Sequence, residues 1–198
     1  EIDETAVRVY AHKSMVIQWL FRRRLAIAAE MVFRHQVHRV LDFGCGIGSL
    51  FPYVCRPEVK VFATDLRPAY AMAVTRRYGY PVTLLDATIW PKTIPDDSLD
   101  AIIALDSLEH VERLPGFITV FKNKLSKSGH LIVSGPTENL LYRVGRSLSG
   151  IHTKGEYHHC NIRSVDKTIT ELGFIRKRKT AVPFGSFLSL FWVLDYAL

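Results

Sequence analysis

Residues 40–48 constrain the fold of this chain more than any other segment, because they join a buried strand to a glycine-rich turn and then to a helix. Residues 39–43 form a short apolar run rich in strand formers, and Gly44, Gly46 and Gly48 follow it directly. Glycine adopts positive φ easily and lacks a side chain, so backbone N–H groups in such a turn can approach a ligand closely. The segment therefore predicts a binding turn for a nucleotide-like ligand.

The spacing of this turn indicates which ligand it suits. Asp42-x-Gly44-x-Gly46-x-Gly48 differs from the Gly-x-Gly-x-x-Gly of dinucleotide-binding folds. The Asp42 carboxylate would repel a pyrophosphate and favour a cationic ligand. A nicotinamide or nucleotide-sugar enzyme stays an alternative, which the spacing disfavours.

Apolar runs and helical patterns alternate along most of the chain, which predicts a parallel sheet with helices on both faces. Strands are expected at 38–43, 59–64, 82–85, 99–105, 130–134 and 174–181, and helices at 49–55, 69–78, 114–125 and 165–172. Residues 3–35 are expected to be helical, with a break at 11–14 where Ser14 caps the second helix. A turn at 183–186 favours a last strand at 187–193, antiparallel to 174–181; the alternative is a helix that dips into a membrane or forms a dimer.

The length of 198 residues, 48% of them hydrophobic, suits a single domain over residues 1–198. Within it we expect a helical N-terminal cap at 1–36 and an α/β core at 37–198. The irregular stretch 135–163 is rich in Gly, Arg and His, and a loop of this length in a compact domain is usually functional, so we expect a lid.

The net charge of +7 favours anionic partners, although a solvated basic surface would explain it equally well. Cys45, Cys55 and Cys160 form no paired framework, which predicts a reducing compartment and thus the cytoplasm. No stretch reaches the roughly 18 apolar residues of a membrane span.

Two segments nevertheless have membrane character, residues 15–33 and 184–198, and both could equally be buried. Each lies beside a basic run, Arg22-Arg23-Arg24 and residues 176–179, which are interpreted as solvated faces or as contacts with lipid headgroups. Peripheral association with an anionic membrane surface is therefore one expectation.

Acidic residues end four of the expected strands. They are Asp42, Asp65, Asp86 and Asp106. In an open α/β sheet the ligand lies beyond the carboxyl ends of the strands. Asp65 follows Gly44 by 65 − 44 = 21 residues, about the distance at which an acid binds two ribose hydroxyls. One such acid alone suits a turn or cap, whereas four in register indicate a ligand.

These motifs resemble the class I S-adenosylmethionine-dependent methyltransferases over roughly residues 37–174. The matching segments are 40–48, 63–65, 84–87, 99–111 and 127–133. Segment 108–111 and the late His158-His159 look most like the small-molecule branch, which includes ubiquinone and menaquinone biosynthesis enzymes. The resemblance implies a Rossmann-like three-layer α/β sandwich, with a mostly parallel seven-stranded sheet whose last strand is antiparallel.

The resemblance also implies S-adenosylmethionine as the cofactor, with S-adenosylhomocysteine as the product. Asp65 would bind the ribose, Asp86 the adenine amine and the Ala87 N–H a ring nitrogen, while Leu105 and Asp106 would border the methionine end. Leu66 and Ile89 would pack on adenine and ribose, or else belong to the core. The expected cofactor-binding residues are Asp42, Gly44, Cys45, Gly46, Gly48, Asp65, Leu66, Asp86, Ala87, Leu105 and Asp106.

Methyl transfer is an in-line displacement in which the protein aligns the reactants and, where needed, removes a proton. The candidate bases are His110, His152, His158 and His159, with Tyr157 beside them. His110 also suits a packing or capping role. No metal site is expected; the alternative is a divalent metal held by Asp106, Glu109 and His110, with a histidine of the long loop.

Absent motifs narrow the acceptor. The chain has no Asn-Pro-Pro-Tyr motif and no Pro-Cys nucleophile, and its length leaves little room for a nucleic-acid recognition domain. We therefore expect a small, apolar, quinone-like or lipid-like acceptor and no nucleic-acid partner. The alternatives are a protein that binds S-adenosylmethionine without turnover, and an RNA-directed methyltransferase.

Overall fold

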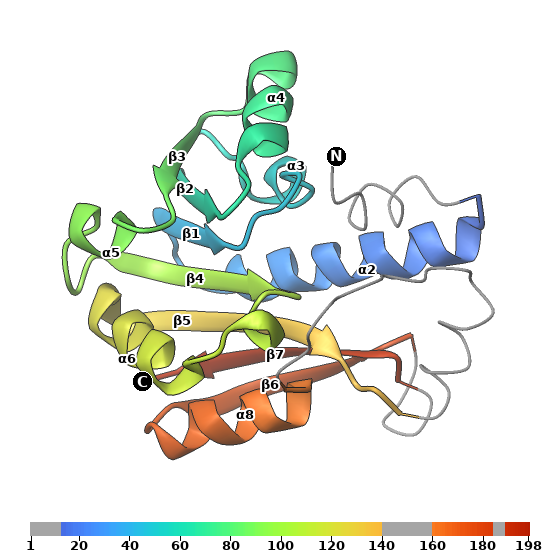
Figure 1. Cartoon of the computed structure of the whole chain (residues 1–198), viewed down its shortest axis with the longest axis vertical. Helices are drawn as coiled ribbons and strands as arrows, with labels where there is room; N and C mark the ends of the chain where they lie inside the picture. Colours follow the sequence, from blue (N-terminus) through green and yellow to red (C-terminus); the bar gives the residue numbers. More distant parts are fainter. Residues whose placement is uncertain (1–12, 140–159, 184–188) are drawn as a thin grey trace.

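The computed structural model describes residues 13–139, 160–183 and 189–198, in which seven strands form one sheet (Figure 1). The strand order is β3-β2-β1-β4-β5-β7-β6, and β7 alone among these strands runs in the direction opposite to the other six. The expected sheet, with its reversed last strand, is confirmed. The strands are β1 Arg39–Phe43, β2 Lys60–Asp65, β3 Val82–Asp86, β4 Leu99–Leu105, β5 Leu125–Pro136, β6 Ile175–Val182 and β7 Phe191–Ala197.

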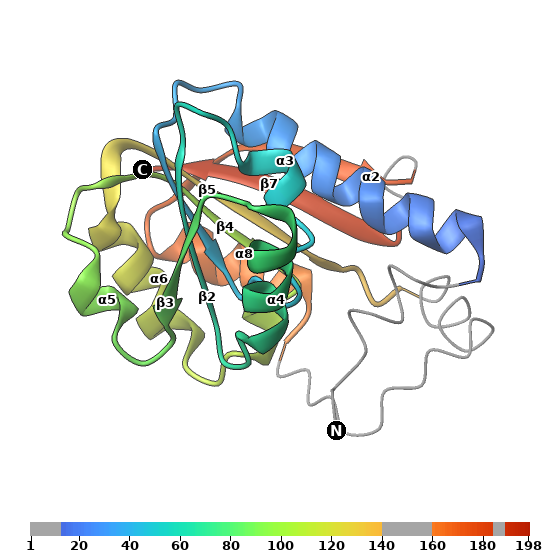
Figure 2. The ribbon, with the colours of Figure 1, turned by 90° about the horizontal axis from the view of Figure 1, so that it is seen from above.

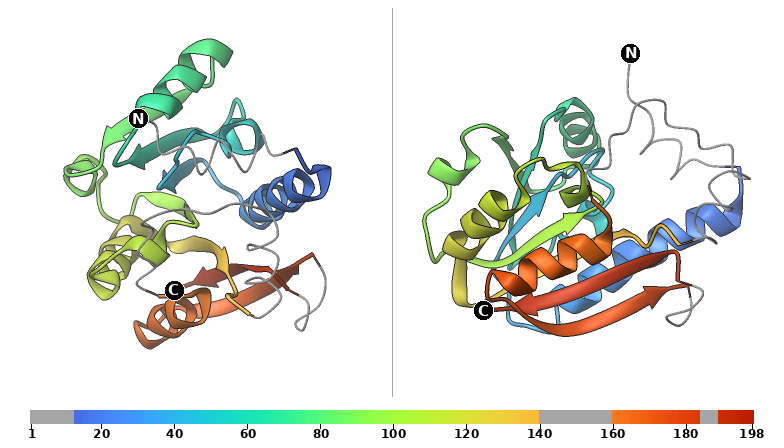
Figure 3. Two further views of the ribbon diagram at one scale, coloured as in Figure 1. Left: turned by 45° about the vertical axis from the view of Figure 1, so that its right-hand side comes forward. Right: turned by 60° about the horizontal axis from the view of Figure 1, so that its bottom comes forward.

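Helices cover both faces of the sheet and make the three expected layers. The helices are α2 Met15–Val32, α3 Phe51–Val54, α4 Ala69–Tyr78, α5 Trp90–Thr93, α6 Leu114–Lys124 and α8 Ile162–Glu171, with a short 3₁₀ turn η1 at Leu108–His110. Side chains of α5, α6 and α8 share one hydrophobic cluster, and those of α2 and α3 share another on the opposite face. The long helix α2 runs across β5 and β7 (Figure 2), and α8 belongs to the other face of the same strands (Figure 3).

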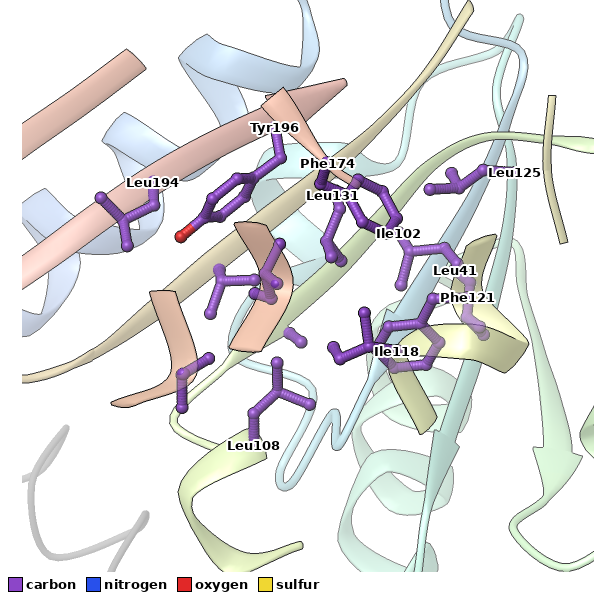
Figure 4. Close-up of a cluster of buried hydrophobic side chains, with 14 of the residues drawn as sticks. Leu41, Ile102, Leu108, Ile118, Phe121, Leu125, Leu131, Phe174, Leu194 and Tyr196 are labelled. Atoms are coloured by element: carbon purple, nitrogen blue, oxygen red, sulfur yellow. The ribbon is translucent and has the colours of Figure 1, made fainter. Parts of the chain in front are cut away.

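Successive residues of the central strands point to opposite layers. Leu41 and Ile102 pack with α6 in the cluster of Figure 4, whereas Val40 and Ile103 pack against the α2 face. All four side chains are fully buried. Burial on both faces explains why these strands form continuous apolar runs in the sequence, and each such side chain contributes about 1.5–3 kcal/mol of stability.

Two elements begin earlier than expected. β5 starts at Leu125 rather than at residue 130, since Leu125 pairs with Leu99 before a register shift in β4. Gly129 allows this close approach: a Cβ there would lie 3.0 Å from the Leu99 carbonyl oxygen. α8 starts at Ile162 rather than at residue 165, because Asn161 caps it.

The segment 189–198 corrects one expectation about membranes. Its strand β7 lies between β5 and β6, and Phe191 to Tyr196 are buried there, so a membrane-dipping or dimer-forming helix is wrong for this part. Residues 1–12, most of the expected lid (140–159) and 184–188 lie outside the described residues. Among the described helices, none combines the length and the apolarity that a membrane span needs.

The N-cap of α8 provides a test of this fold. The Asn161 side chain accepts hydrogen bonds from the backbone N–H groups of Arg163 and Ser164 at 3.0 and 3.1 Å. We expect Asn161→Ala to lower the free energy of unfolding by about 1 kcal/mol, because these N–H groups lose their acceptor. Asn161→Asp keeps an acceptor and should stay close to the wild type in urea denaturation. Equal losses in both variants would contradict the cap.

Candidate functional site

The turn after β1 is held tightly between two neighbouring segments. The backbone N–H groups of Gly44 and Cys45 donate to the Thr64 carbonyl at 2.9 and 3.1 Å. On the other side, the Ser107 hydroxyl donates to the Phe43 carbonyl at 3.1 Å. Gly44 has φ +73°, and a Cβ there would lie 2.5 Å from the Ser107 Cβ. Only glycine fits at this position.

The outer part of the turn has a different environment. Gly46 has φ +53°, and a Cβ placed on it would meet no atom within 4 Å, so this stretch of backbone borders open space. Gly48, by contrast, packs so closely on the Phe51 ring that a Cβ would lie 2.5 Å from it. The turn thus presents bare backbone at Gly46 while Gly44 and Gly48 anchor it.

The acids that end β2 and β3 lie side by side, since Asp65 and Asp86 are register partners. The two carboxylate oxygens of Asp65 accept from the backbone N–H groups of Gly46 and Arg67, each at 2.8 Å. Asp86 accepts from the backbone N–H of Thr88 at 2.7 Å, and hydrogen bonds from Thr88 lower its pKa. Both carboxylates are therefore oriented by backbone donors at the edge of the sheet.

Asp42 lies beneath the turn and is buried. Burial raises the pKa of its carboxyl to about 7, and the nearby charge of Asp65 adds to the rise. Within the described residues its buried Oδ2 atom has no hydrogen-bond partner. A buried carboxyl with an unused acceptor beside bare backbone fits a ligand that carries positive charge.

The fourth acid, Asp106, follows β4 and forms an ion pair with Arg24 of α2. Arg24 is 2% exposed and lies over the rings of Phe21 and Phe191. The interpretation of the three arginines as a solvated or lipid-facing run is therefore wrong for Arg24, whereas Arg22 and Arg23 are exposed. The pair joins α2 to the edge of the sheet where Asp42 and Asp65 lie.

Glu109 adds another carboxyl to this region. It is 3% exposed, and its pKa is raised well above the usual range by burial and by the charge of Asp106, against the opposing effect of Arg24. Burial and the neighbouring Asp106 charge thus both favour the protonated form of this carboxyl over the ionised one.

The expected catalytic histidines remain predictions. His110 ends η1 with an exposed side chain, while His152, His158, His159 and Tyr157 lie outside the described residues. The alternative metal set is not gathered: Glu109 is buried and His110 is exposed, and the described ranges bring three metal-binding side chains together at His35, His130 and Asp195 instead.

The apolar candidates are placed more clearly. Leu66 is 86% exposed and Ile89 is 51% exposed, so the alternative that they belong to the core is wrong. Leu105 and Ala87 are half-buried where β4 and β3 end. All these side chains follow or end strands at one edge of the sheet, as a ligand-binding role requires.

Sequence reasoning missed Arg24 and Ser107. The sequence did contain an indication that one arginine is buried. Three consecutive arginines span about 200° of a helix, so one of them must turn away from the exposed face. No sequence pattern indicates the role of Ser107, because its contact with Gly44 depends on the close packing of β1 against β4.

The raised pKa of Asp42 predicts how stability depends on pH. The Asp42 carboxyl titrates near pH 4 in an unfolded chain and at about pH 7 in the folded one. Its contribution to the free energy of unfolding is therefore fully present below pH 4 and is lost as the pH rises through 7. We expect Asp42→Asn to have the same free energy of unfolding as the wild type near pH 4. At pH 8 its free energy of unfolding should be about 3–4 kcal/mol higher than that of the wild type.

Urea denaturation across this pH range would measure the difference. Asp97→Asn, in an exposed turn, is the control and should follow the wild type at each pH. A difference between Asp42→Asn and the wild type that does not change with pH would rule out the titration of Asp42.

Known proteins resemble this chain in sequence and in structure. A family model described as a methyltransferase domain matches residues 17–186. A probable S-adenosylmethionine-dependent methyltransferase of Mycobacterium tuberculosis is 25% identical over 157 residues, which cover 78% of this chain and 55% of that protein. The mitochondrial ubiquinone biosynthesis O-methyltransferase of Schizosaccharomyces pombe is 26% identical over 113 residues, 54% of this chain and 40% of that protein. The chain thus spans about half the length of the curated relatives it matches.

Solved structures agree on the fold. Magnesium protoporphyrin IX methyltransferase from Synechocystis, solved with bound S-adenosylhomocysteine, superposes with a TM-score of 0.70. The two are 18% identical, and the match covers 98% of this chain and 92% of that one. The sheet order, the glycine turn and the match of the family model lead to one conclusion: this chain belongs to the methyltransferase domain family and has the fold of the class I S-adenosylmethionine-dependent methyltransferases.

Proposed function

We propose that the protein transfers a methyl group from S-adenosylmethionine to a small apolar acceptor, quinone-like or lipid-like, that it reaches from an anionic membrane surface. The proposal of a membrane-borne apolar acceptor rests on an exposed stripe of apolar and basic side chains on α2. A relative named for ubiquinone biosynthesis supports the same class of acceptor.

The residues of the glycine turn fit the cofactor. Bound S-adenosylmethionine supplies an activated methyl group. Asp65 would accept from the ribose hydroxyls and Asp86 from the adenine amine, since both carboxylates lie at the sheet edge already oriented by backbone donors. Asp42 would hold the positive end, because its buried Oδ2 has an unused acceptor position.

The protein's part in the reaction is then alignment and, for a hydroxyl acceptor, removal of a proton. The glycine turn and the end of β4 would orient the cofactor for this transfer. The proton would pass to a histidine of the segment after β5, for which His152, His158 and His159 are the candidates.

One face of α2 carries the exposed stripe. Met15, Val16 and Trp19 are 83%, 66% and 48% exposed, and Arg22 and Arg23 are exposed one turn further on. At 100° per residue these five side chains fall within about 120° of the helix circumference. Apolar and aromatic side chains beside arginines are typical of a helix that lies on an anionic lipid surface.

The stripe lies at the same edge of the sheet as the cofactor residues. The first turns of α2 are on the side where β4 and β5 end (Figure 1). Arg24, in the middle of the helix, reaches Asp106 directly after β4. A membrane that contacts the stripe would therefore present an apolar acceptor close to the methyl group.

Liposome flotation tests the membrane contact. We expect the wild type to float with vesicles of phosphatidylglycerol and phosphatidylcholine at low salt, and to bind more weakly as salt screens the arginines. Trp19→Glu should bind at least tenfold more weakly, because it places a charge where the ring inserts.

Tyr78→Glu is the matched control, since Tyr78 is a similarly exposed aromatic residue at the end of α4. It should bind vesicles like the wild type. Absence of flotation at low salt, or equal loss in both variants, would overturn the membrane contact.

Calorimetry tests the cofactor site. We expect Asp65→Ala to weaken S-adenosylmethionine binding by about 1–3 kcal/mol, or roughly 5- to 150-fold, through loss of the ribose hydrogen bonds. Glu58→Ala removes an exposed carboxylate at the other end of β2 and should leave the affinity unchanged. Unchanged affinity in Asp65→Ala would refute the role of Asp65.

A turnover assay separates the alternatives. Labelled S-adenosylmethionine is supplied with a long-chain hydroquinone in vesicles, and in parallel with RNA. Methylation of the hydroquinone supports the proposal. Methylation of RNA alone, or binding of the cofactor without transfer to either, would overturn the proposed acceptor.

A further inference from the structure

Two histidines and an aspartate from three distant segments converge at the edge of the sheet opposite the cofactor turn. His35 lies between α2 and β1, His130 lies near the start of the regular pairing of β5, and Asp195 belongs to β7. Their ligand atoms all fall within 4.8 Å of one another. His130 and Asp195 are 8% and 3% exposed, whereas about a third of the His35 side chain is exposed.

The geometry within this cluster is well defined. The His130 Nδ1 lies 2.7 Å from the Asp195 Oδ1, and the His35 Nε2 lies 3.6 Å from the Asp195 Oδ2. The two imidazole rings stack with centroids 3.5 Å apart and planes 19° apart. Each ring therefore directs one nitrogen towards a different oxygen of the same carboxylate.

A hydrogen bond between His130 and Asp195 explains only part of this arrangement. The Nε2 atom of His35 is shielded from solvent and makes no hydrogen bond, and its separation from Asp195 exceeds hydrogen-bond length. A buried polar atom of this kind requires a partner. A cation placed between the rings and the carboxylate would use all three groups.

We propose that His35, His130 and Asp195 bind a divalent metal ion of the zinc class. Ligands of a tetrahedral zinc ion lie about 3.4 Å apart for bonds of about 2.0–2.2 Å, close to the separation of His35 and Asp195. A small rotation of the Asp195 carboxylate away from His130 would relieve their shorter contact. Two nitrogen ligands with one oxygen suit zinc.

The ion would act on stability rather than on methyl transfer. It would join the connection before β1 to β5 and β7, at the edge of the sheet away from Asp42 and Asp65. The proposal is therefore independent of the proposed function, and its test needs no activity measurement.

The experiment uses the whole chain without a histidine tag, stripped with EDTA and dialysed. We expect one equivalent of Co²⁺ to produce the visible absorption of a tetrahedral site. An excess of Zn²⁺ at about 100 times the dissociation constant should raise Tm by about 5–10 °C. His35→Gln should lose both responses, and because His35 is partly exposed this variant should still fold.

His38→Gln is the matched control, since His38 lies in the same connection with an exposed side chain. It should keep the Co²⁺ absorption and the Zn²⁺ shift. The proposal is overturned if the wild type shows neither response, if His35→Gln responds like the wild type, or if both variants lose the responses equally.

Discussion

The ion pair between the buried Arg24 and the partly exposed Asp106 fixes how the longest described helix meets the sheet. Loss of Asp106 would leave the Arg24 charge buried and uncompensated, which costs about 3–5 kcal/mol in such pairs. The Arg24 guanidinium also packs over the rings of Phe21 and Phe191, so charge and packing set the same orientation. The position of the exposed stripe at one end of α2, and of His35 just beyond the other end, follows from it.

Charge is distributed unevenly along the carboxyl edge of the sheet. Asp42 and Glu109 are buried with raised pKa values, and added positive charge would stabilise the ionised form of each carboxyl. Arg24 forms an ion pair with Asp106 on this edge. The edge is therefore preorganised for a cationic ligand at the cost of some stability in its absence, as is common for binding sites.

Much of the fold could be predicted because local patterns agreed with the tertiary structure. Residues 69–78 and 99–105 form α4 and β4 with the expected bounds. The expected start of β5 at residue 130 was wrong. In the sequence Gly129 suggests a turn, whereas in the structure it allows a close approach to Leu99. The acids at the strand ends could be predicted from the rule that ligands lie beyond the carboxyl ends of the strands in an open α/β sheet. The inward direction of Arg24 could not, because it depends on Asp106, 82 positions further along the chain (106 − 24 = 82).

The place of β7 between β5 and β6 has a consequence for how the protein folds. Within the described part, β6 has no sheet neighbour except β7, so it can join the sheet only after β7 has paired. That pairing is non-local: Ser134 meets Val193, 193 − 134 = 59 residues away, and contacts of this kind form slowly. The strands β3, β2, β1 and β4 need no residue of β7, so the glycine turn belongs to the half that can assemble first. Until β7 arrives, the free edge of β5 exposes unpaired backbone, and this is the stage at which the chain is most open to mispairing.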